Sequence, residues 1–255
     1  MSGPGGPGRD YSWDDHWRRY AAATRANPGQ ALRRQTVFRL LGPGAARPGA
    51  TILDFGCGSG DMLDAVAGRF PKAELAAADG SDDGLAMTRA AVPRAALYKC
   101  DFRRAESLPG ELLGWASHVV CSEVLEHVAE PVKVLENAAR CLKPGGRLAV
   151  TVPGGPMSAF DKAIGHLGHY TRERLADEMA RAGLRVEVAA AAGFPVFNAY
   201  RLLVLMRGPR LIDDIADGPG MLARMVMAPL RWLMPLSLAD SRWGWLICGA
   251  ATRPE

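Results

Sequence analysis

Three glycines stand at the centre of the most chemically informative stretch of the chain. Gly56, Gly58 and Gly60 fall within ILDFGCGSGDML (52–63), after an apolar run and before a helix-forming one. Glycine allows the backbone a positive φ and lets a ligand lie directly against it. Many nucleotide-binding folds place such a loop between a strand and a helix, so the segment predicts a nucleotide or nucleoside site.

The acids around this loop discriminate between nucleotide ligands. A dinucleotide fingerprint GxGxxG would require glycine at position 61, where the chain has Asp61, and a pyrophosphate would meet Asp54 and Asp61 as like charges. A ligand that carries an ammonium and a sulfonium would be attracted by the same carboxylates. The sequence therefore favours S-adenosylmethionine as the cofactor and disfavours a nicotinamide dinucleotide.

Two further acids fall at the ends of predicted strands. Asp79 follows the loop at the spacing at which an acid binds ribose hydroxyls in this topology. Asp101, with Phe102 next to it, is placed to accept a hydrogen bond from an adenine amino group while the ring packs nearby. Each acid alone has a simpler interpretation: Asp54 as a turn cap, Asp79 in an Asx-turn with Gly80, Asp101 as a solvated loop residue. Their combination with the glycine loop favours the ligand interpretation.

Strands and helices alternate through the middle of the chain, which predicts an α/β fold with a parallel sheet. The acids would then lie at the carboxyl edge of the sheet, where open α/β sheets bind ligands. Helices are expected over about 61–70, from about Asp82, from Pro131 to Leu142, and from a Thr171 cap to Gly183. The predicted strands are 50–55, 74–79, 96–100, 117–121, 147–152, 184–188 and 245–251.

The core of this fold is expected over residues 46–193. Residues 1–12 are expected to form a flexible tail, and 13–45 an N-terminal helical extension or lid, with one helical pattern from Trp13 to Leu41 that ends at GPG (42–44). Residues 244–255 hold the last strand and a tail. Between them, 194–243 form a helical insertion longer than the connection expected there, which indicates a function such as a substrate lid or an interface.

The most apolar part of this insertion is MLARMVMAPLRWLMPL (221–236). Its prolines, arginines and length exclude a membrane span. Three roles remain: a lid over an apolar acceptor, a surface helix in peripheral contact with a membrane interface, or burial against the domain or a homodimer partner.

Composition narrows the classes of partner. The 31 basic and 27 acidic residues give a net charge of only +4, with no basic run, so we expect a small-molecule partner and no nucleic acid. The five cysteines form no CxxC pair and lie in apolar segments, which predicts a reducing compartment. The N-terminus lacks the pattern of a secretion signal. A cytoplasmic protein, monomeric or homodimeric, is expected.

In its central part the chain resembles the class I methyltransferases. LDFGCGSG is similar to their first motif, AAADGS to the segment with their ribose acid, KCDF to their adenine contact, and LKPGGRLAVTVP to their post-motif strand. VVCSEVLEHVAEP (119–131) is similar to a segment of ubiquinone-type O-methyltransferases. The resemblance covers about residues 50–190. The last 60 residues match none of these motifs, so the substrate class does not carry over.

This resemblance implies a Rossmann-like, mostly parallel sheet of seven strands with the last strand antiparallel and helices on both faces. It also implies transfer of a methyl group from S-adenosylmethionine, with S-adenosylhomocysteine as product. Carried over residue by residue, the cofactor-binding set is Gly56 and Gly58 at the methionine moiety, Asp79 with Gly80 at the ribose, Asp101 and Phe102 at the adenine, Asp54 beneath the loop, and Ser122 and Glu123 at the methionine end.

Methyl transfer needs alignment and, for an O–H or N–H acceptor, a base. His127, His166 and His169 follow the fourth and fifth predicted strands, and we expect His166 or His169 to be the base; each has the alternative of a passive loop contact. Glu123, Glu126 and His127 have helical spacing and could share a face that binds a divalent cation. Such a trio is more often an ordinary helix start, with glutamate at the positive end of the helix dipole, and we assign no metal.

Aromatic residues are the candidates for acceptor binding. Trp13 and Trp17 share one face of the first helix with Tyr20, where they would close over the site or attach the extension to the core. Arg25, Arg33 or Arg34 would meet the cofactor carboxylate. We assign Trp13, Trp17, Tyr170 and Phe194 to substrate binding. The sequence thus predicts methylation, most simply O-methylation, of a small apolar molecule; the alternatives are intramolecular cyclisation or a non-catalytic protein that binds S-adenosylmethionine.

Overall fold

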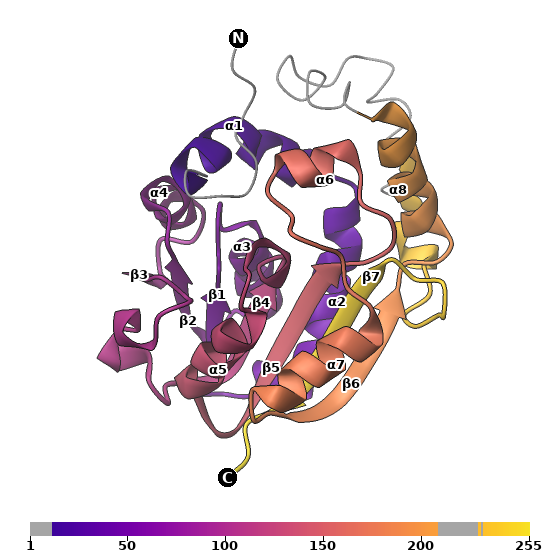
Figure 1. The fold of residues 1–255 in the computed structure, drawn as a ribbon. Helices are drawn as coiled ribbons and strands as arrows, with labels where there is room; N and C mark the ends of the chain where they lie inside the picture. The colour runs from indigo at the N-terminus through magenta and orange to yellow at the C-terminus, as the bar shows by residue number, and fades with distance from the viewer. Residues whose placement is uncertain (1–11, 209–228, 231) are drawn as a thin grey trace.

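The protein folds around one seven-stranded sheet with the strand order β3-β2-β1-β4-β5-β7-β6 (Figure 1). The computed structural model describes residues 12–208, 229–230 and 232–255. The strands are β1 (Thr51–Phe55), β2 (Glu74–Asp79), β3 (Ala96–Lys99), β4 (Ala116–Ser122), β5 (Leu142–Pro153), β6 (Arg185–Ala192) and β7 (Leu246–Thr252). Strands β1 to β5 pair in parallel, and β7 runs antiparallel to both β5 and β6. The predicted sheet, with its antiparallel last strand, is confirmed.

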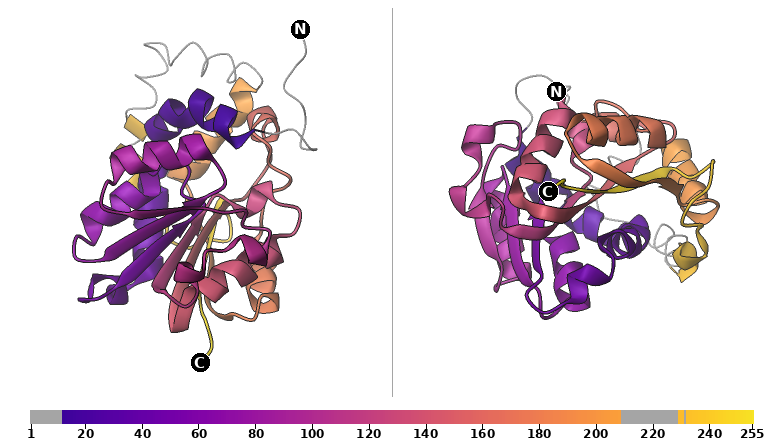
Figure 2. Two further views of the ribbon diagram at one scale, coloured as in Figure 1. Left: turned by 90° about the vertical axis from the view of Figure 1, so that its left-hand side faces the viewer. Right: turned by 90° about the horizontal axis from the view of Figure 1, so that it is seen from below.

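Helices cover both faces of this sheet (Figure 2). One face packs on α2 (Gly29–Leu41), α3 (Asp61–Arg69), α4 (Asp82–Ala91) and α8 (Val196–Arg207), and the other on α5 (Pro131–Cys141) and α7 (Arg172–Arg181). All five residues of β1 are buried, as expected of a central parallel strand that is covered on both faces. The sheet separates two apolar clusters, so the edge formed by the strand ends is held rigidly.

The N-terminal extension differs from its predicted form. The single helical pattern expected from Trp13 to Leu41 is two helices, α1 (Trp13–Ala26) and α2, because Asn27 ends the first in an extended conformation and Pro28 begins the next turn. The short 3-10 helix η1 (Pro43–Ala46) follows. The break lets α1 turn across the carboxyl edge of the sheet and contact α4 (Figure 1).

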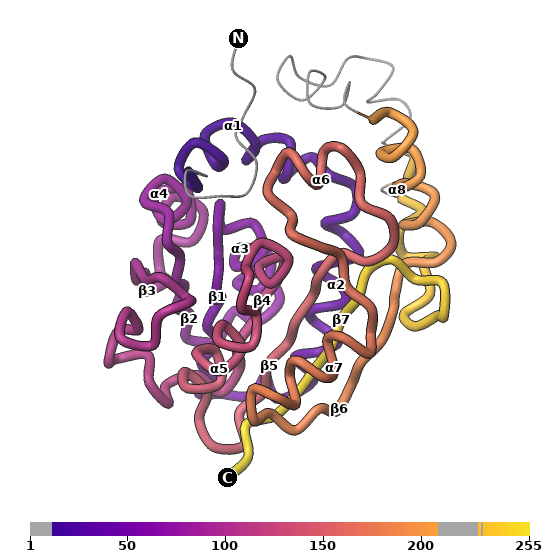
Figure 3. The backbone as a smooth tube through the Cα atoms, in the orientation of Figure 1, coloured from indigo at the N-terminus to yellow at the C-terminus, as the bar shows by residue number. Residues whose placement is uncertain are grey.

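After β5 the chain rises over the same edge before it returns to the sheet. This segment, residues 153–171, is called the strap here; it contains α6 (Ala159–Ala163), and Figure 3 traces it from the end of β5 to the start of α7. Its two ends are joined, because Tyr170 N–H donates to Pro153 O at 2.9 Å. The 3-10 helices η2 (Ala105–Ser107), η3 (Gly110–Leu112) and η4 (Leu125–His127) complete the loops around the edge.

The long connection between β6 and β7 contains α8 and the 3-10 helix η5 (Met234–Leu236). The predicted tail and most of the apolar run 221–236 lie outside the described residues. Within the part of the chain that is described, no helix combines the length and the apolar character needed to cross a membrane.

Candidate active site

The glycine loop bends closely around the end of β1. Gly56, Gly58 and Gly60 all have positive φ, at 90°, 49° and 77°. The N–H groups of Gly56 and Cys57 donate to Ala78 O at 2.9 and 3.2 Å, which fixes the turn against β2. A Cβ atom at Gly56 would overlap the side chain of Val124. The loop therefore presents bare backbone in the form that its sequence predicts.

Asp54 and Asp79 lie buried beside this loop, 2% and 7% exposed. Asp79 accepts hydrogen bonds from Gly58 N–H and from Ser81 N–H, each at 2.8 Å, so it forms the Asx-turn and also clamps the loop. Oδ2 of Asp54 is buried with no hydrogen-bond partner among the described residues. Burial, and then the charge of Asp79, raise the pKa of Asp54 to about 7, and burial raises the pKa of Asp79 as well.

A buried carboxyl oxygen without a hydrogen-bond partner is costly unless a ligand pairs with it. A cationic group near the loop would supply that partner, and a phosphate would not. Asp61 adds less to this argument than its sequence position suggests, because Arg34 Nη2 lies 2.6 Å from its Oδ2 and Arg25 Nε lies 3.5 Å from its Oδ1. Asp54 and Asp79, and not Asp61, are therefore the acids beside the loop that have no cationic partner among the described residues.

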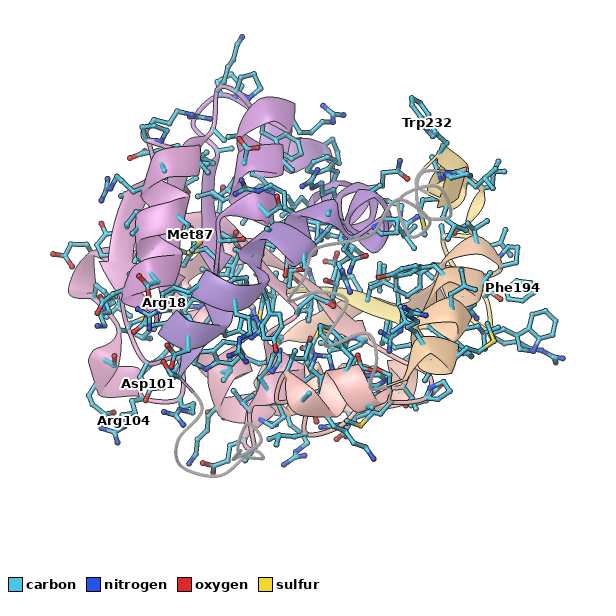
Figure 4. All side chains as sticks on the ribbon, turned by 90° about the horizontal axis from the view of Figure 1, so that it is seen from above. Arg18, Met87, Asp101, Arg104, Phe194 and Trp232 are labelled. Carbon is cyan, nitrogen blue, oxygen red and sulfur yellow. The ribbon has the colours of Figure 1, made fainter. Side chains whose placement is uncertain are left out.

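The predicted adenine contacts lie at the far end of this edge. Arg103 binds the Asp101 carboxylate through two N–H groups at 2.8 and 2.9 Å, and its hydrogen bond holds the pKa of Asp101 below the usual value. The Phe102 ring packs on Phe55, with centroids 4.6 Å apart. Figure 4 places Asp101 and Phe194 at opposite ends of the molecule, so these two residues do not contact one small ligand.

The end of β4 provides two polar side chains near the loop. Ser122 Oγ and Thr151 Oγ1 are hydrogen-bonded at 2.7 Å, and Arg33 Nη2 lies 2.7 Å from Glu123 Oε2. Glu123 has a φ of 58°, which is unfavourable for a residue with a side chain and is typical of functional sites. The expectation that Glu123, Glu126 and His127 form a helix start is wrong: Glu123 precedes the 3-10 helix η4, and α5 begins at Pro131.

The three predicted histidines meet between η4 and the strap. The rings of His127 and His166 are perpendicular with centroids 4.7 Å apart, and His166 Nδ1 lies 3.3 Å from His169 Nε2. Burial lowers the pKa of His127 to about 3 and that of His166 to about 2, and it lowers the pKa of His169. All three imidazoles are therefore neutral at pH 7, as a proton acceptor must be.

Two partners of this cluster were not predicted from the sequence. His16, on α1, is buried and reaches the cluster through Trp13, whose ring contacts both His16 and His127. Arg201, on α8, forms a buried ion pair with Asp161 of the strap. The position of His16 in an amphipathic helix could have indicated its burial. No local pattern indicates the pairing of Arg201 with Asp161, because the two residues are 40 positions apart.

The predicted substrate residues divide between two places. Trp13 and Trp17 lie on α1, where Trp17 packs on the bare backbone of Gly58. Tyr170 and Phe194 line a separate groove of about 870 Å³ together with Trp243 and Trp245. Gly155 lies between this groove and the histidine cluster, since its carbonyl accepts a hydrogen bond from His169 and its backbone lies against Trp245.

Among the residues that the structure describes, two groups of side chains have the spacing of cation ligands. Glu126, His127 and His166 form one group, and Asp161, His166 and His169 the other, with donor atoms within 4.8 Å of one another in each. Hydrogen bonds and the ion pair with Arg201 already hold the second group together. In the first, burial and then the charge of Glu123 raise the pKa of Glu126 well above its usual value, which favours its neutral form. We assign no ion to either.

The strand order, the glycine loop and the acids at the strand ends together define a Rossmann-like protein of the class I methyltransferase type. Residues 16–188, more than half of the chain, match the methyltransferase domain family. The protein belongs to that family, whose enzymes use S-adenosylmethionine.

Individual relatives agree on the fold and differ in chemistry. The ubiquinone biosynthesis O-methyltransferase of Xanthomonas campestris is 33% identical over 47% of this chain and 49% of its own length. Phosphoethanolamine N-methyltransferase 2 of Haemonchus contortus, solved with S-adenosyl-L-methionine, superposes with a TM-score of 0.63 at 17% identity, covering 97% of this chain and 61% of that one. The [4+2]-cyclase SpnF gives 0.60 at 15% identity, covering 99% of both chains. The chain spans about half the length of the curated relatives it matches.

Proposed function

We propose that this protein transfers the methyl group of S-adenosylmethionine to an oxygen atom of a small, largely apolar acceptor. The observation that carries the proposal is the pair of buried acids at the glycine loop, one of which has an unpartnered oxygen, because it calls for a cationic nucleoside. Asp54, Asp79 and the loop backbone would hold the cofactor, Asp101 and Phe102 its adenine, and Ser122 and Glu123 its methionine end.

The sulfonium supplies the activated methyl group, so the chain's own residues have to align the acceptor, exclude water and remove a proton. The strap and α1 close the carboxyl edge of the sheet, and the neutral histidines His166 and His169 lie on the strap. As the acceptor oxygen attacks the methyl carbon, its proton passes to one of these imidazoles.

Methylation at an oxygen atom is supported by the match with ubiquinone biosynthesis O-methyltransferases and by the similarity of segment 119–131 to those enzymes. An apolar acceptor is supported by the aromatic groove at Tyr170, Phe194, Trp243 and Trp245. Leu202, Met206 and Trp232, all within the predicted insertion, are exposed, which supports a peripheral membrane or partner contact through the insertion.

A turnover screen tests the proposal. Purified protein is incubated with S-adenosylmethionine and a panel of phenols, apolar alcohols and amines, and both nucleoside and acceptor products are identified by mass spectrometry. We expect S-adenosylhomocysteine together with a methylated hydroxyl compound. Methylthioadenosine would instead establish cyclisation, and tight binding without any turnover would establish a binding protein; either result overturns the proposal.

A further inference from the structure

A buried ion pair joins the connection between β6 and β7 to the strap. Arg201 on α8 donates two hydrogen bonds to Asp161 on α6, from Nη1 to Oδ1 at 3.2 Å and from Nη2 to Oδ2 at 2.7 Å. The two residues are only 8% and 2% exposed. Oδ2 of the same carboxylate lies 3.6 Å from Nε2 of His169. The charge balance of this pair therefore acts directly on a candidate base.

Hydrogen bonds fix the positions of the protons on the two strap histidines. Gly155 O can only accept, so His169 Nδ1, at 2.9 Å, carries the hydrogen. Nε2 of a neutral His169 then holds the lone pair and accepts the N–H of His166 Nδ1 at 3.3 Å. This leaves the lone pair of His166 on Nε2, to which no described residue is hydrogen-bonded. His166 Nε2 is thus the atom that is free to take a proton.

This arrangement holds only while His169 is neutral. Without a counter-charge, the Asp161 carboxylate would favour a second proton on His169 Nε2. A protonated Nε2 cannot accept from His166, so the ring of His166 would turn or change tautomer and its Nε2 would lose the lone pair.

We infer that Arg201 is a positioning residue for proton removal: by neutralising Asp161 it keeps His169 neutral, and His169 in turn keeps Nε2 of His166 free. The inference rests on the proposed function, because only an acceptor with an O–H or N–H gives the base a task. In the transfer step the acceptor oxygen forms a bond to the methyl carbon and the carbon–sulfur bond breaks. Its electron pair stays on sulfur, and the acceptor's proton goes to His166 Nε2 and later to water.

Arg201 is the decisive charge among the groups that face the two rings. Of these groups it alone carries a permanent positive charge, so its removal leaves Asp161 without a counter-charge, whereas Glu123 keeps its ion pair with Arg33. The groups are Asp161 from α6, Arg201 from α8, Glu126 and His127 from η4, and Glu123 from the end of β4.

The test follows the protonation of the histidines in the full chain. Imidazole nitrogen NMR across a pH titration, with EDTA present, is compared between the unaltered protein and Arg201→Met. We expect the pKa of His169 to rise by about 1 to 3 units in the variant, since an unscreened carboxylate a few ångström away has that effect. His166 should change from the Nδ1–H to the Nε2–H tautomer. With an acceptor from the turnover screen, the acid limb of kcat should shift upward in pH by a similar amount at unchanged affinity for S-adenosylmethionine.

Three further variants separate charge from packing. Arg201→Lys keeps the positive charge and should titrate like the unaltered protein. Arg201→Met combined with Asp161→Asn removes both charges and should also restore the titration, and it replaces the single variant if the unpaired carboxylate prevents folding. Arg172→Met is the matched control, because Arg172 ties the start of α7 to Asp240 and to Ser241 O of the same connection.

An unchanged His169 titration in Arg201→Met, or a raised one in the doubly substituted protein, would overturn the inference. So would an equal shift in Arg172→Met. The NMR measurement needs no acceptor, so a failure of methyl transfer in the screen counts against the proposed function alone.

Discussion

Substitution of Gly58 by alanine probes how the N-terminal extension meets the cofactor loop. Gly58 has a φ of 49°, and a Cβ atom there would overlap the indole of Trp17, with its Cε2 atom only 2.8 Å away. The same indole lies against Gly84 of α4, with Cδ1 3.1 Å from the position of a Cβ. Trp17 is thus inserted between the loop and α4, and a methyl group at position 58 must displace it.

The expected cost has two parts. Alanine at a positive φ is disfavoured by about 1 to 2 kcal/mol. Displacement of a half-buried indole loses about another 1 to 2 kcal/mol of apolar burial. Gly58→Ala should therefore lower the free energy of unfolding by about 2 to 4 kcal/mol. Gly49→Ala isolates the first part, because Gly49 has a φ of 78° and a Cβ there would have no neighbour within 4 Å.

Urea unfolding of Gly58→Ala, of Trp17→Ala and of the protein with both substitutions measures the coupling free energy between the two residues. Once Trp17→Ala has removed the indole, Gly58→Ala should cost only its backbone part, so Trp17 and Gly58 should couple by about 1 to 2 kcal/mol. Trp17→Ala should also speed dissociation of S-adenosylmethionine, measured by stopped flow. Equal costs of Gly58→Ala with and without Trp17 would show that α1 does not close on this loop and refute the reasoning.

Three other outcomes follow from single charged or titratable groups. Asp79→Asn should weaken S-adenosylmethionine binding at least about tenfold by calorimetry, since a charged hydrogen bond contributes about 1.5 to 3 kcal/mol; an unchanged affinity would remove Asp79 from the cofactor site. Because the pKa of Asp54 is raised to about 7, affinity for the cation should rise as pH passes upward through 7, and Asp54→Asn should flatten that rise. Burial, with Arg147 nearby, lowers the pKa of His118 to about 4. As the pH falls, His118 is therefore protonated at a higher pH in the unfolded chain than in the folded protein. The free energy of unfolding should fall by up to about 3 kcal/mol between pH 6.5 and pH 4. His118→Gln should remove this loss in acid denaturation curves.

The sheet could be predicted from the sequence because its signals are local. Apolar runs such as 50–55 and 117–121 need no knowledge of their neighbours, and the glycine loop and Asp79 mark strand ends directly. The break between α1 and α2 also has a local signal, Pro28. We overlooked it because the helical periodicity continues on both sides of that residue. The antiparallel last strand came from the resemblance, because nothing in residues 245–251 sets a direction.

The site could be predicted only as far as its members are close in sequence. His166 and His169 are three residues apart on one loop, so their meeting was expected, whereas Asp161 and Arg201 meet through tertiary packing alone. Arg33 likewise meets Glu123 across the interface of α2 with the end of β4. Which residues meet in this way depends on how the helices pack across the edge of the sheet. The spacing of residues along the chain does not reveal that packing.

The loop acids and the strap histidines share one electrostatic property. Burial favours the neutral form of both sets, raising the pKa of Asp54 to about 7 and lowering that of His166. S-adenosylmethionine would bring a positive charge into this low-dielectric region and draw the proton from Asp54. Because transfer would remove that charge from sulfur, Asp54 would hold its proton more tightly beside S-adenosylhomocysteine than beside S-adenosylmethionine. The pH dependence expected for cofactor binding should therefore be weaker for the product, and this difference would favour product release.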